Sequence, residues 1–177
     1  MKRSIAVFNV DELRDYRNVI NNNLKQGMVM LQKLINSVDT LSFFKSIKYE
    51  KTVIEPLTGQ PENLLEVINQ CQTYLVSIMA LEYLFAKHSD ISFRINFGNV
   101  SGYDIESEDG RIIAECFAAT SYRSNGKLTK DLKRLAGNQK AIHKYEFFYD
   151  TEFTDIHKNY YQKQYPDIEI VKFEDVY

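Results

Sequence analysis

Two acidic residues, Asp104 and Glu115, stand in neighbouring strand-like runs of the chain, 102–105 and 111–117. The segment between the runs contains an Asp-Gly pair at 109–110, a strong signal for a tight turn. Folding the second run back on the first brings the two carboxylates close together on adjacent strands. Mg²⁺ is usually held by one or two carboxylates, with waters and a substrate phosphate completing its shell. The pair therefore predicts metal-assisted phosphodiester chemistry.

A basic segment follows the predicted hairpin. Residues 123–144 contain seven Lys or Arg and one acid, whereas the whole chain has a net charge of -2. Such a cluster beside a carboxylate pair suits a phosphate backbone, because the cations attract it while the carboxylates hold the metal. The alternative is a solvated helix face, which is the more common origin of a charge run. The position next to the hairpin favours binding.

Each carboxylate also has a structural explanation. Glu115 lies in the nearly continuous apolar run 112–119, typical of a central strand covered on both faces. An ionised glutamate there needs a metal or a cationic partner, and a nearby lysine in a buried ion pair is the alternative to the metal. Asp104 has the alternative of accepting backbone hydrogen bonds at a strand end. Glu66 is a candidate third carboxylate on a predicted helix, although a solvated helix position is the better explanation of it.

The composition describes one globular unit. A chain of 177 residues fits a single domain with its own core, and 44% hydrophobic and 13% aromatic residues argue against disorder. Cys71 and Cys116 fall in apolar segments and are expected to be reduced and buried, and the three histidines show no zinc-ligand spacing. The apolar stretch at the N-terminus is too short for a signal peptide, and we expect no membrane span. The predicted location is the cytoplasm.

The first half of the chain has helical periodicity. Apolar spacing predicts a long helix over residues 12–37, capped by Asp11 and broken at Gly27. Residues 42–60 contain a proline and a glycine and are expected to form a connector with one short strand or helical turn. A second long helix is predicted over 61–87, with the proline at its start in the first turn.

From residue 91 the apolar period changes from helical to alternating. The predicted order is strand 91–97, strand 102–107, strand 111–119, helix 127–136, strand 143–149, helix 152–164 and strand 168–173. The later strand–helix–strand units imply right-handed crossovers, so the sheet should be antiparallel at the hairpin and parallel after it. We therefore predict an α/β fold with a mixed central sheet, in which residues 61–177 form the core and residues 1–60 add an N-terminal helix and connector.

This arrangement of elements and acidic residues resembles the core of the restriction-endonuclease-like superfamily of PD-(D/E)xK nucleases. The family motif is an Asp at the start of one strand, followed further along the chain by Glu or Asp, any residue, and Lys. In this chain Gly102-Tyr103-Asp104 matches the first part and Glu115-Cys116-Phe117 the second. The resemblance extends over about residues 61–171, and the order of elements carries more of it than the short motif does.

One position departs from the family pattern. Phe117 stands where the family has its lysine, and the two-residue period of a strand directs it to the same side as Glu115. Some members of the superfamily place the lysine on the following helix, where this chain has Lys127 and Lys130. The alternative is that the site has decayed and that the fold now serves binding or assembly.

The resemblance implies a Mg²⁺- or Mn²⁺-dependent DNA endonuclease of the type II restriction enzyme kind. Asp104 and Glu115 would be the metal ligands, and Lys127 or Lys130 would offset the charge on the attacked phosphate. The residues expected to contact the nucleic acid are Arg123, Asn125, Lys133 and Arg134. RNA and branched DNA remain open as substrates.

Cutting both strands of a duplex implies a homodimer, for which the first helix is the candidate contact element. The alternative function is a catalytically inactive nuclease-fold protein that acts as a DNA-binding or assembly subunit of a larger restriction or defence complex. Phe117 favours that alternative.

Overall fold

The computed structural model of the chain describes residues 4–98 and 100–176. Its centre is a six-stranded sheet with the strand order β1-β4-β5-β6-β7-β8. The strands are β1 (Ser4–Val7), β4 (Phe93–Asn96), β5 (Ile105–Ser107), β6 (Ile112–Ala118), β7 (His143–Tyr149) and β8 (Ile168–Phe173). The pairings from β1 to β6 are antiparallel and those from β6 to β8 are parallel. The predicted mixed α/β sheet is confirmed.

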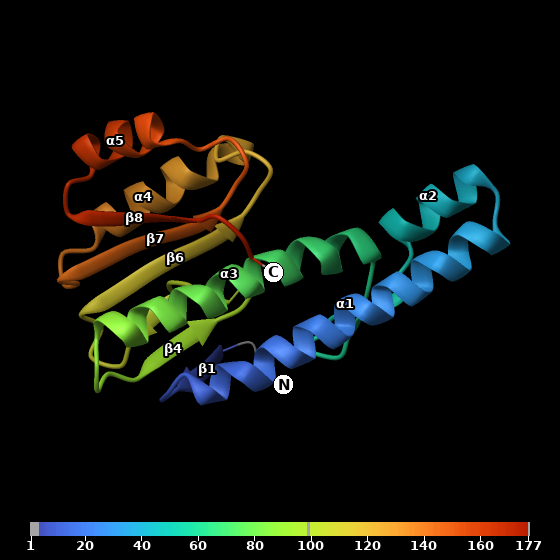
Figure 1. The fold of residues 1–177 in the computed structure, drawn as a ribbon, viewed down its shortest axis with the longest axis horizontal. Coiled ribbons are helices and arrows are strands. Elements are labelled where there is room, and N and C mark those ends of the chain that lie inside the picture. Colours follow the sequence, from blue (N-terminus) through green and yellow to red (C-terminus); the bar gives the residue numbers. More distant parts are fainter. Residues whose placement is uncertain (1–3, 99, 177) are drawn as a thin grey trace.

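Helices cover both faces of this sheet (Figure 1). The helix α3 (Leu64–Lys87) packs across β6 and β7 on one face, and α1 (Asp11–Ser37) packs beside α3. The opposite face carries α4 (Lys127–Gly137) over β6 and β7, and α5 (Asp155–Gln164) over β8. The sheet is therefore buried on both sides, which explains the continuous apolar run of β6.

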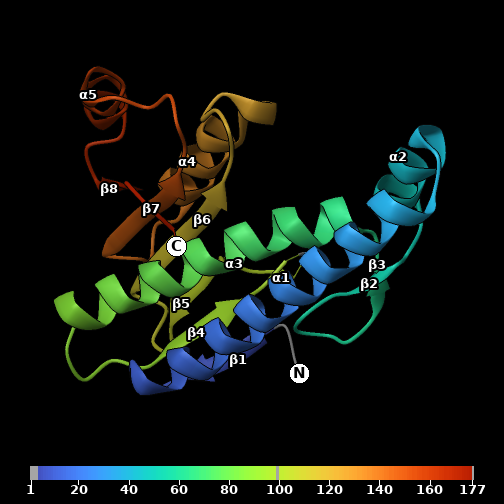
Figure 2. The same ribbon diagram turned by 45° about the vertical axis from the view of Figure 1, so that its right-hand side comes forward.

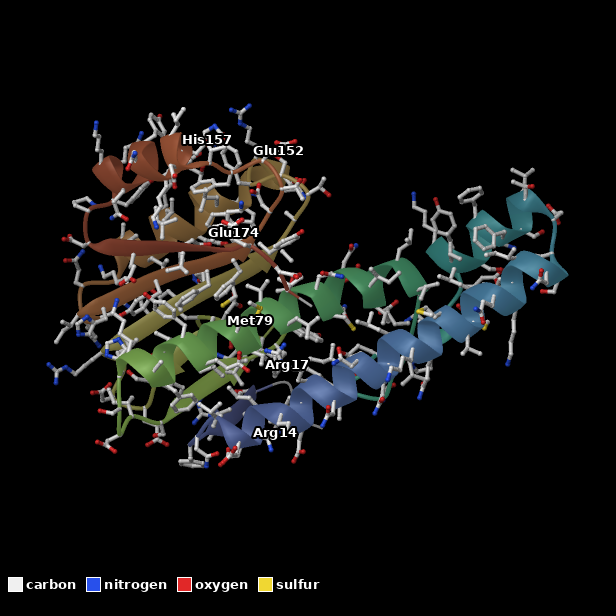
Figure 3. The ribbon with its side chains drawn as sticks, viewed as in Figure 1. Arg14, Arg17, Met79, Glu152, His157 and Glu174 are labelled. Atoms are coloured by element: carbon white, nitrogen blue, oxygen red, sulfur yellow. The ribbon has the colours of Figure 1, made fainter. Side chains whose placement is uncertain are left out.

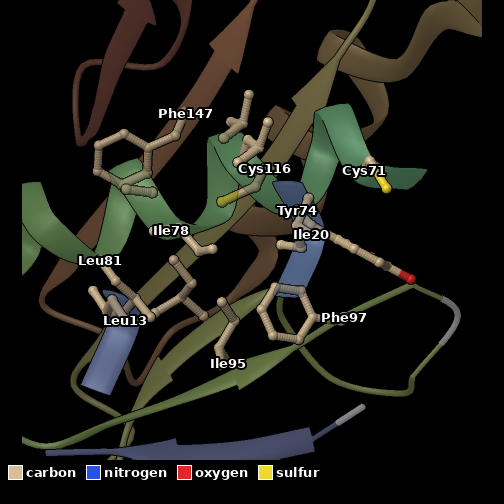
Figure 4. Packing of buried hydrophobic residues seen from close by; sticks show 14 of the residues in the cluster. Leu13, Ile20, Cys71, Tyr74, Ile78, Leu81, Ile95, Phe97, Cys116 and Phe147 are labelled. Carbon is tan, nitrogen blue, oxygen red and sulfur yellow. The ribbon is translucent and has the colours of Figure 1, made fainter. Parts of the chain in front are cut away.

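The alternation of β6 divides its side chains between two hydrophobic cores. Ala114 and Cys116 join the larger core on the α3 side, whereas Ile113 and Phe117 join a smaller core beneath α4 and α5. The larger core contains Leu13, Ile20, Ile78, Leu81, Ile95 and Phe97, which Figure 4 shows meeting between α1, α3 and the β4 region. Glu115 is two residues from both Ile113 and Phe117, so its side chain points to the same face of β6 as theirs, towards α4.

Several N-terminal elements differ from the prediction. The first helix is continuous from Asp11 to Ser37, and its N-cap is Val10, so Asp11 is inside the helix and Gly27 does not break it. Gly27 is instead a contact point, because a Cβ atom at this position would meet the Leu64 side chain at 3.1 Å. The helix continues there because a glycine inside a helix costs only about 1 kcal/mol, less than the packing of a long amphipathic helix supplies.

The predicted connector contains a whole helix, α2 (Thr40–Tyr49), capped by Asp39, which accepts hydrogen bonds from two backbone N–H groups. It is followed by the small hairpin of β2 (Val53–Ile54) and β3 (Pro61–Glu62). Pro61 therefore lies in a strand and not in a helix. The cap of α3 is Asn63, whose side chain accepts from the Glu66 N–H group.

The strand β1 was not predicted, and it pairs with β4 at the edge of the sheet. The first 60 residues thus contribute a strand to the sheet and are more than an appended helix. Figure 2 shows the C-terminal half of α1, α2 and the β2–β3 hairpin, here called the arm (residues 24–62), extending beyond the sheet. An ion pair of Arg17 with Glu82, at 3.1 Å, ties α1 to α3, and Figure 3 shows Arg17 between the two helices.

Within the described part of the chain, α3 is the one helix that is long and apolar enough to cross a membrane. More than half of the qualifying window is buried inside the fold, as in the core helix of a water-soluble protein. Its apolar character is therefore accounted for by its central position between α1 and the sheet.

The contact of α1 with α3 generates a stability prediction. Replacing Gly27 by Leu forces a side chain against Leu64 and should lower the free energy of unfolding by about 1–3 kcal/mol. Replacing Gly137, where a Cβ atom meets nothing within 4 Å, by Ala is the control and should change it by less than about 1 kcal/mol. Urea unfolding followed by circular dichroism measures both. Equal stability of the two variants would show that α1 does not pack on α3 through Gly27.

Candidate active site

The predicted hairpin of β5 and β6 is present and brings the two acidic residues together. The strands run antiparallel with Ile105 opposite Ala114, and one further step in this register places Asp104 opposite Glu115. Gly110 lies in the connecting loop with a left-handed φ of 68°. The turn signal in the sequence therefore predicted the geometry of the pair.

Backbone hydrogen bonds fix the segment that carries Asp104. The Cys116 N–H group donates to Asp104 Oδ2 at 2.8 Å, so the predicted structural role of this carboxylate is present as well. The Asn96 N–H group donates to the carbonyl oxygen of Asp104 at 2.8 Å. The buried Asn96 side chain also donates to the carbonyl oxygen of Tyr103 at 2.7 Å. Both neighbouring strands, β4 and β6, thus hold the Asp104 segment in place.

The partner of Glu115 is an arginine. Glu115 is 1% exposed, and its Oε1 atom lies 2.6 Å from Nη1 of Arg134 on α4. The guanidinium also stacks over the Tyr103 ring at 4.7 Å and donates to the carbonyl oxygen of Gly102 at 2.5 Å. The sequence analysis gave a lysine as the alternative partner of Glu115, and the structure has Arg134 in that place. Arg134 joins α4 to Glu115 and to the Asp104 segment, and its side chain stays 46% exposed, so its expected DNA contact remains a prediction.

Lys127, the first residue of α4, also points at buried carboxylates. Its Nζ atom lies 2.9 Å from Oδ2 and 3.0 Å from Oδ1 of Asp131, whose side chain is 7% exposed. Burial acts to lower the pKa of Lys127, but the hydrogen bond and charge of Asp131 outweigh it and raise the pKa. The charges of Asp104 and Glu115 act in the same direction. Lys127 therefore stays protonated beside the carboxylate pair.

Sequence reasoning missed a further carboxylate, Glu146. This residue is fully buried on β7 directly beside Glu115 in the parallel register. Within the described residues neither of its carboxyl oxygens has a hydrogen-bond partner, and burial raises its pKa well above the usual range. The sequence pattern that could have identified Glu146 is the one that identified Glu115, namely a single acid inside an apolar strand.

All four carboxyl groups beneath α4 resist ionisation. Burial, and then the charge of Asp104, raise the pKa of Glu115 to about 8. Burial likewise raises the pKa of Asp104 and of Asp131. Four acids share this space with two cations, Lys127 and Arg134, so full ionisation would leave a negative excess in a poorly solvated region.

A cleft of about 350 Å³ opens beside this cluster, between α3, the end of β6 and the start of α4. Asp104 and Lys127 both line it, together with Asn125 and Glu66. Glu115 is not among its lining residues and lies beneath the surface that the cleft exposes. Of the two carboxylates, Asp104 is thus the one in direct reach of a ligand.

The other basic residues predicted to contact the substrate are not among those that line the cleft. Lys130, Lys133 and Arg123 are exposed, so Lys127 and not Lys130 is the candidate lysine that reaches the cleft. Arg123 lies over the Tyr122 ring at 5.2 Å, near the start of α4. These three residues are accessible to a nucleic acid, and Arg134 also keeps an exposed side chain while it is paired with Glu115.

Phe117 lies in the core, as its register requires. Its ring stacks on Phe148 with centroids 5.0 Å apart and planes 5° from parallel. The position that carries lysine in the PD-(D/E)xK nucleases is therefore occupied in this chain by an aromatic ring packed in the core. Among the described residues, three or more His, Cys, Asp or Glu side chains nowhere converge in an arrangement that holds a metal ion.

No protein-family model, curated protein or solved structure matches the chain. The functional interpretation consequently rests on the residues and geometry of the chain itself.

The raised pKa of Glu115 predicts a pH dependence of stability. Its folded-state pKa of about 8 lies above the usual 4.5, so the native state binds more protons than the unfolded state in this window. The free energy of unfolding should therefore fall as pH rises from about 4.5 to 8. Urea unfolding at pH 5, 6.5 and 8 measures it.

The control substitutions separate Glu115 from carboxylates in general. Glu115→Gln should make the fall in stability smaller, because three other acids with raised pKa values remain, whereas Glu106→Gln, on the neighbouring strand and partly exposed, should leave it unchanged. Stability of the unaltered protein that is constant or rising over this pH range would contradict the buried-acid description.

Proposed function

We propose that the protein is a metal-dependent endonuclease that hydrolyses phosphodiester bonds in DNA. The observation that carries this proposal is the pairing of Asp104 and Glu115 on adjacent strands, with the amine of Lys127 lining the same cleft as Asp104. The mixed sheet, antiparallel at the hairpin and parallel beyond it, supports the resemblance to PD-(D/E)xK nucleases.

A divalent cation at this site would require Glu115 to release the Arg134 guanidinium. Asp104 and Glu115 would hold Mg²⁺ or Mn²⁺, and two carboxylates are within the number that Mg²⁺ usually takes from a protein. The four carboxyl groups outnumber the two cations paired with them, Lys127 and Arg134, and a bound divalent cation would favour the ionised form of acids whose pKa burial raises. When bound, the cation would supply activation of the attacking water and offset charge on the phosphate.

Lys127 would supply the positive charge near the attacked phosphate that Phe117 cannot supply. Lys127 lines the cleft, and its ammonium group would attract a phosphate bound there and stabilise the negative charge that develops on it. Asp104 keeps its orientation through the Cys116 N–H group and shares a hydrogen bond with the Glu115 carboxyl group, which a bound cation would replace.

The expected substrate approaches over α4. Arg123, Lys130 and Lys133 are exposed there, and Asn125 lines the cleft itself. These cations would bind the DNA backbone, with an affinity that falls as salt concentration rises. We place the enzyme in the cytoplasm, where its two free and buried cysteines, Cys71 and Cys116, stay reduced.

A homodimer would allow both strands of a duplex to be cut, and the arm is its candidate contact. Large apolar side chains are exposed along it, among them Met28 (61%), Phe44 (59%) and Leu41 (81%). Large exposed apolar patches often mark interaction surfaces.

A second function is favoured by two specific observations. Phe117 is packed in the core, and Glu115 is already paired with Arg134. A protein that kept the nuclease fold without its chemistry, as a DNA-binding or assembly subunit, would show both features. Activity measurements separate the two functions.

Cleavage of supercoiled plasmid with Mg²⁺ or Mn²⁺ tests the enzyme directly. We expect nicking or cutting that chelation by EDTA abolishes and that Glu115→Ala lowers at least about 100-fold, because removal of a metal ligand removes the cation. Glu106→Gln is the matched control and should retain activity. A folded protein that binds DNA and leaves it intact with either metal would favour the inactive alternative.

The choice of lysine is tested separately. Lys127→Met should lower kcat by about 100-fold or more, since it removes the charge that faces the phosphate, whereas Lys130→Met should mainly weaken DNA binding. Single-turnover rates at saturating protein, with fluorescence anisotropy for binding, distinguish the two effects. A larger loss of rate in Lys130→Met than in Lys127→Met would refute the assignment.

A further inference from the structure

We propose that Asp131 is a positioning residue, which holds the amine of Lys127 in the cleft and away from the two metal-binding carboxylates. This inference rests on the proposed function, because it gives Asp131 a role in the same reaction. Asp131 entered the sequence analysis only as the single acid of a basic segment.

The contact itself is specific. Both carboxylate oxygens of Asp131 lie within 3.0 Å of Lys127 Nζ, and the Asp131 side chain is 7% exposed. Burial of a carboxylate is unfavourable unless a cation or hydrogen-bond donor compensates it, and Lys127 is that cation. The pair is one helical turn apart on the face of α4 that covers the sheet.

Helix stability does not explain this pair. The N-terminal end of a helix carries partial positive charge and favours acids, yet α4 begins with Lys127 and has no acidic residue in its first turn. The N-cap residue, Gly126, has a left-handed φ of 63° and supplies no side-chain cap, and Asn125 before it has a φ of 54°. A lysine at this position opposes the helix dipole, as residues at functional sites often oppose local preferences.

The position of the amine matters because other anions lie nearby. Asp104 and Glu115 both attract Lys127 electrostatically. An amine that bound either carboxylate would occupy the place of the cation, and an amine free in solvent would not face the phosphate. Asp131 holds the amine of Lys127, a residue that lines the cleft, so that the amine does not compete for Asp104 or Glu115.

The experiment combines kinetics with a direct view of the amine. Asp131→Asn keeps the size of the side chain and removes its charge, and Asp131→Glu keeps the charge and moves it. We expect kcat to fall about tenfold or more in Asp131→Asn with KM changed less than threefold, and an intermediate kcat in Asp131→Glu. In a Lys127→Met background Asp131→Asn should have no further effect on kcat, because two residues that act as a unit are not additive.

The second readout needs no activity. Lysine amines are labelled by reductive methylation with ¹³C-formaldehyde, and the Lys127 signal is assigned by its absence in Lys127→Arg. We expect its chemical shift to differ from that of exposed Lys133 in the unaltered protein and to move to the Lys133 position in Asp131→Asn. Glu82→Gln breaks the ion pair with Arg17 between α1 and α3 and is the matched control, which should leave the signal in place.

The outcomes separate the two proposals. An unchanged Lys127 signal in Asp131→Asn, or loss of activity through KM alone, overturns the positioning role even if the protein cuts DNA. A protein without nuclease activity whose Lys127 signal moves as expected overturns the proposed function, while the placement of the amine by Asp131 stands.

Discussion

The enclosure of four carboxyl groups between the sheet and α4 is the constraint on which the structure around the cleft depends. Asp104, Glu115, Asp131 and Glu146 come from three strands or strand ends and one helix, and in the described residues the cations that pair with them are Lys127 and Arg134. Burying uncompensated charge is costly, so such a cluster must hold protons, cations or both. Glu115, Asp131 and Glu146 are buried, whereas Asp104 lines the cleft.

The fold positions the cluster through ordinary sheet geometry. The antiparallel step from β5 to β6 places Asp104 opposite Glu115, and the parallel step from β6 to β7 places Glu146 beside Glu115. The crossover between β6 and β7 contains α4, so this helix covers the side chains of Glu115 and Glu146. It also carries the two cations, Lys127 and Arg134. The cleft opens where the β6 strand ends and this crossover begins, the usual place for ligands in open α/β sheets.

The sequence allowed prediction of this region better than of the N-terminal one. Periodicity and turn signals predicted the hairpin, the later strands and α4, because long apolar patterns and an Asp-Gly turn dominate local structure there. The strand β1 and the pair β2–β3 are short, and their pairing partners lie far away in the sequence, so no local pattern specifies them. The helix α2 was hidden by Pro56 and Gly59, although Asp39 offered a cap signal. Side-chain partners were least predictable: that Arg134 and not a lysine reaches Glu115 depends on the rotation of α4.

Anomalous diffraction from crystals grown with Mn²⁺ would show whether Asp104 and Glu115 together hold a divalent cation. We expect an anomalous peak at coordination distance from a carboxylate oxygen of each residue, with the Arg134 guanidinium moved away from Glu115 and the peak lost in Glu115→Gln. Full retention of the Arg134–Glu115 ion pair, with no peak between the two carboxylates at millimolar Mn²⁺, would contradict this expectation and would leave the fold a scaffold for binding.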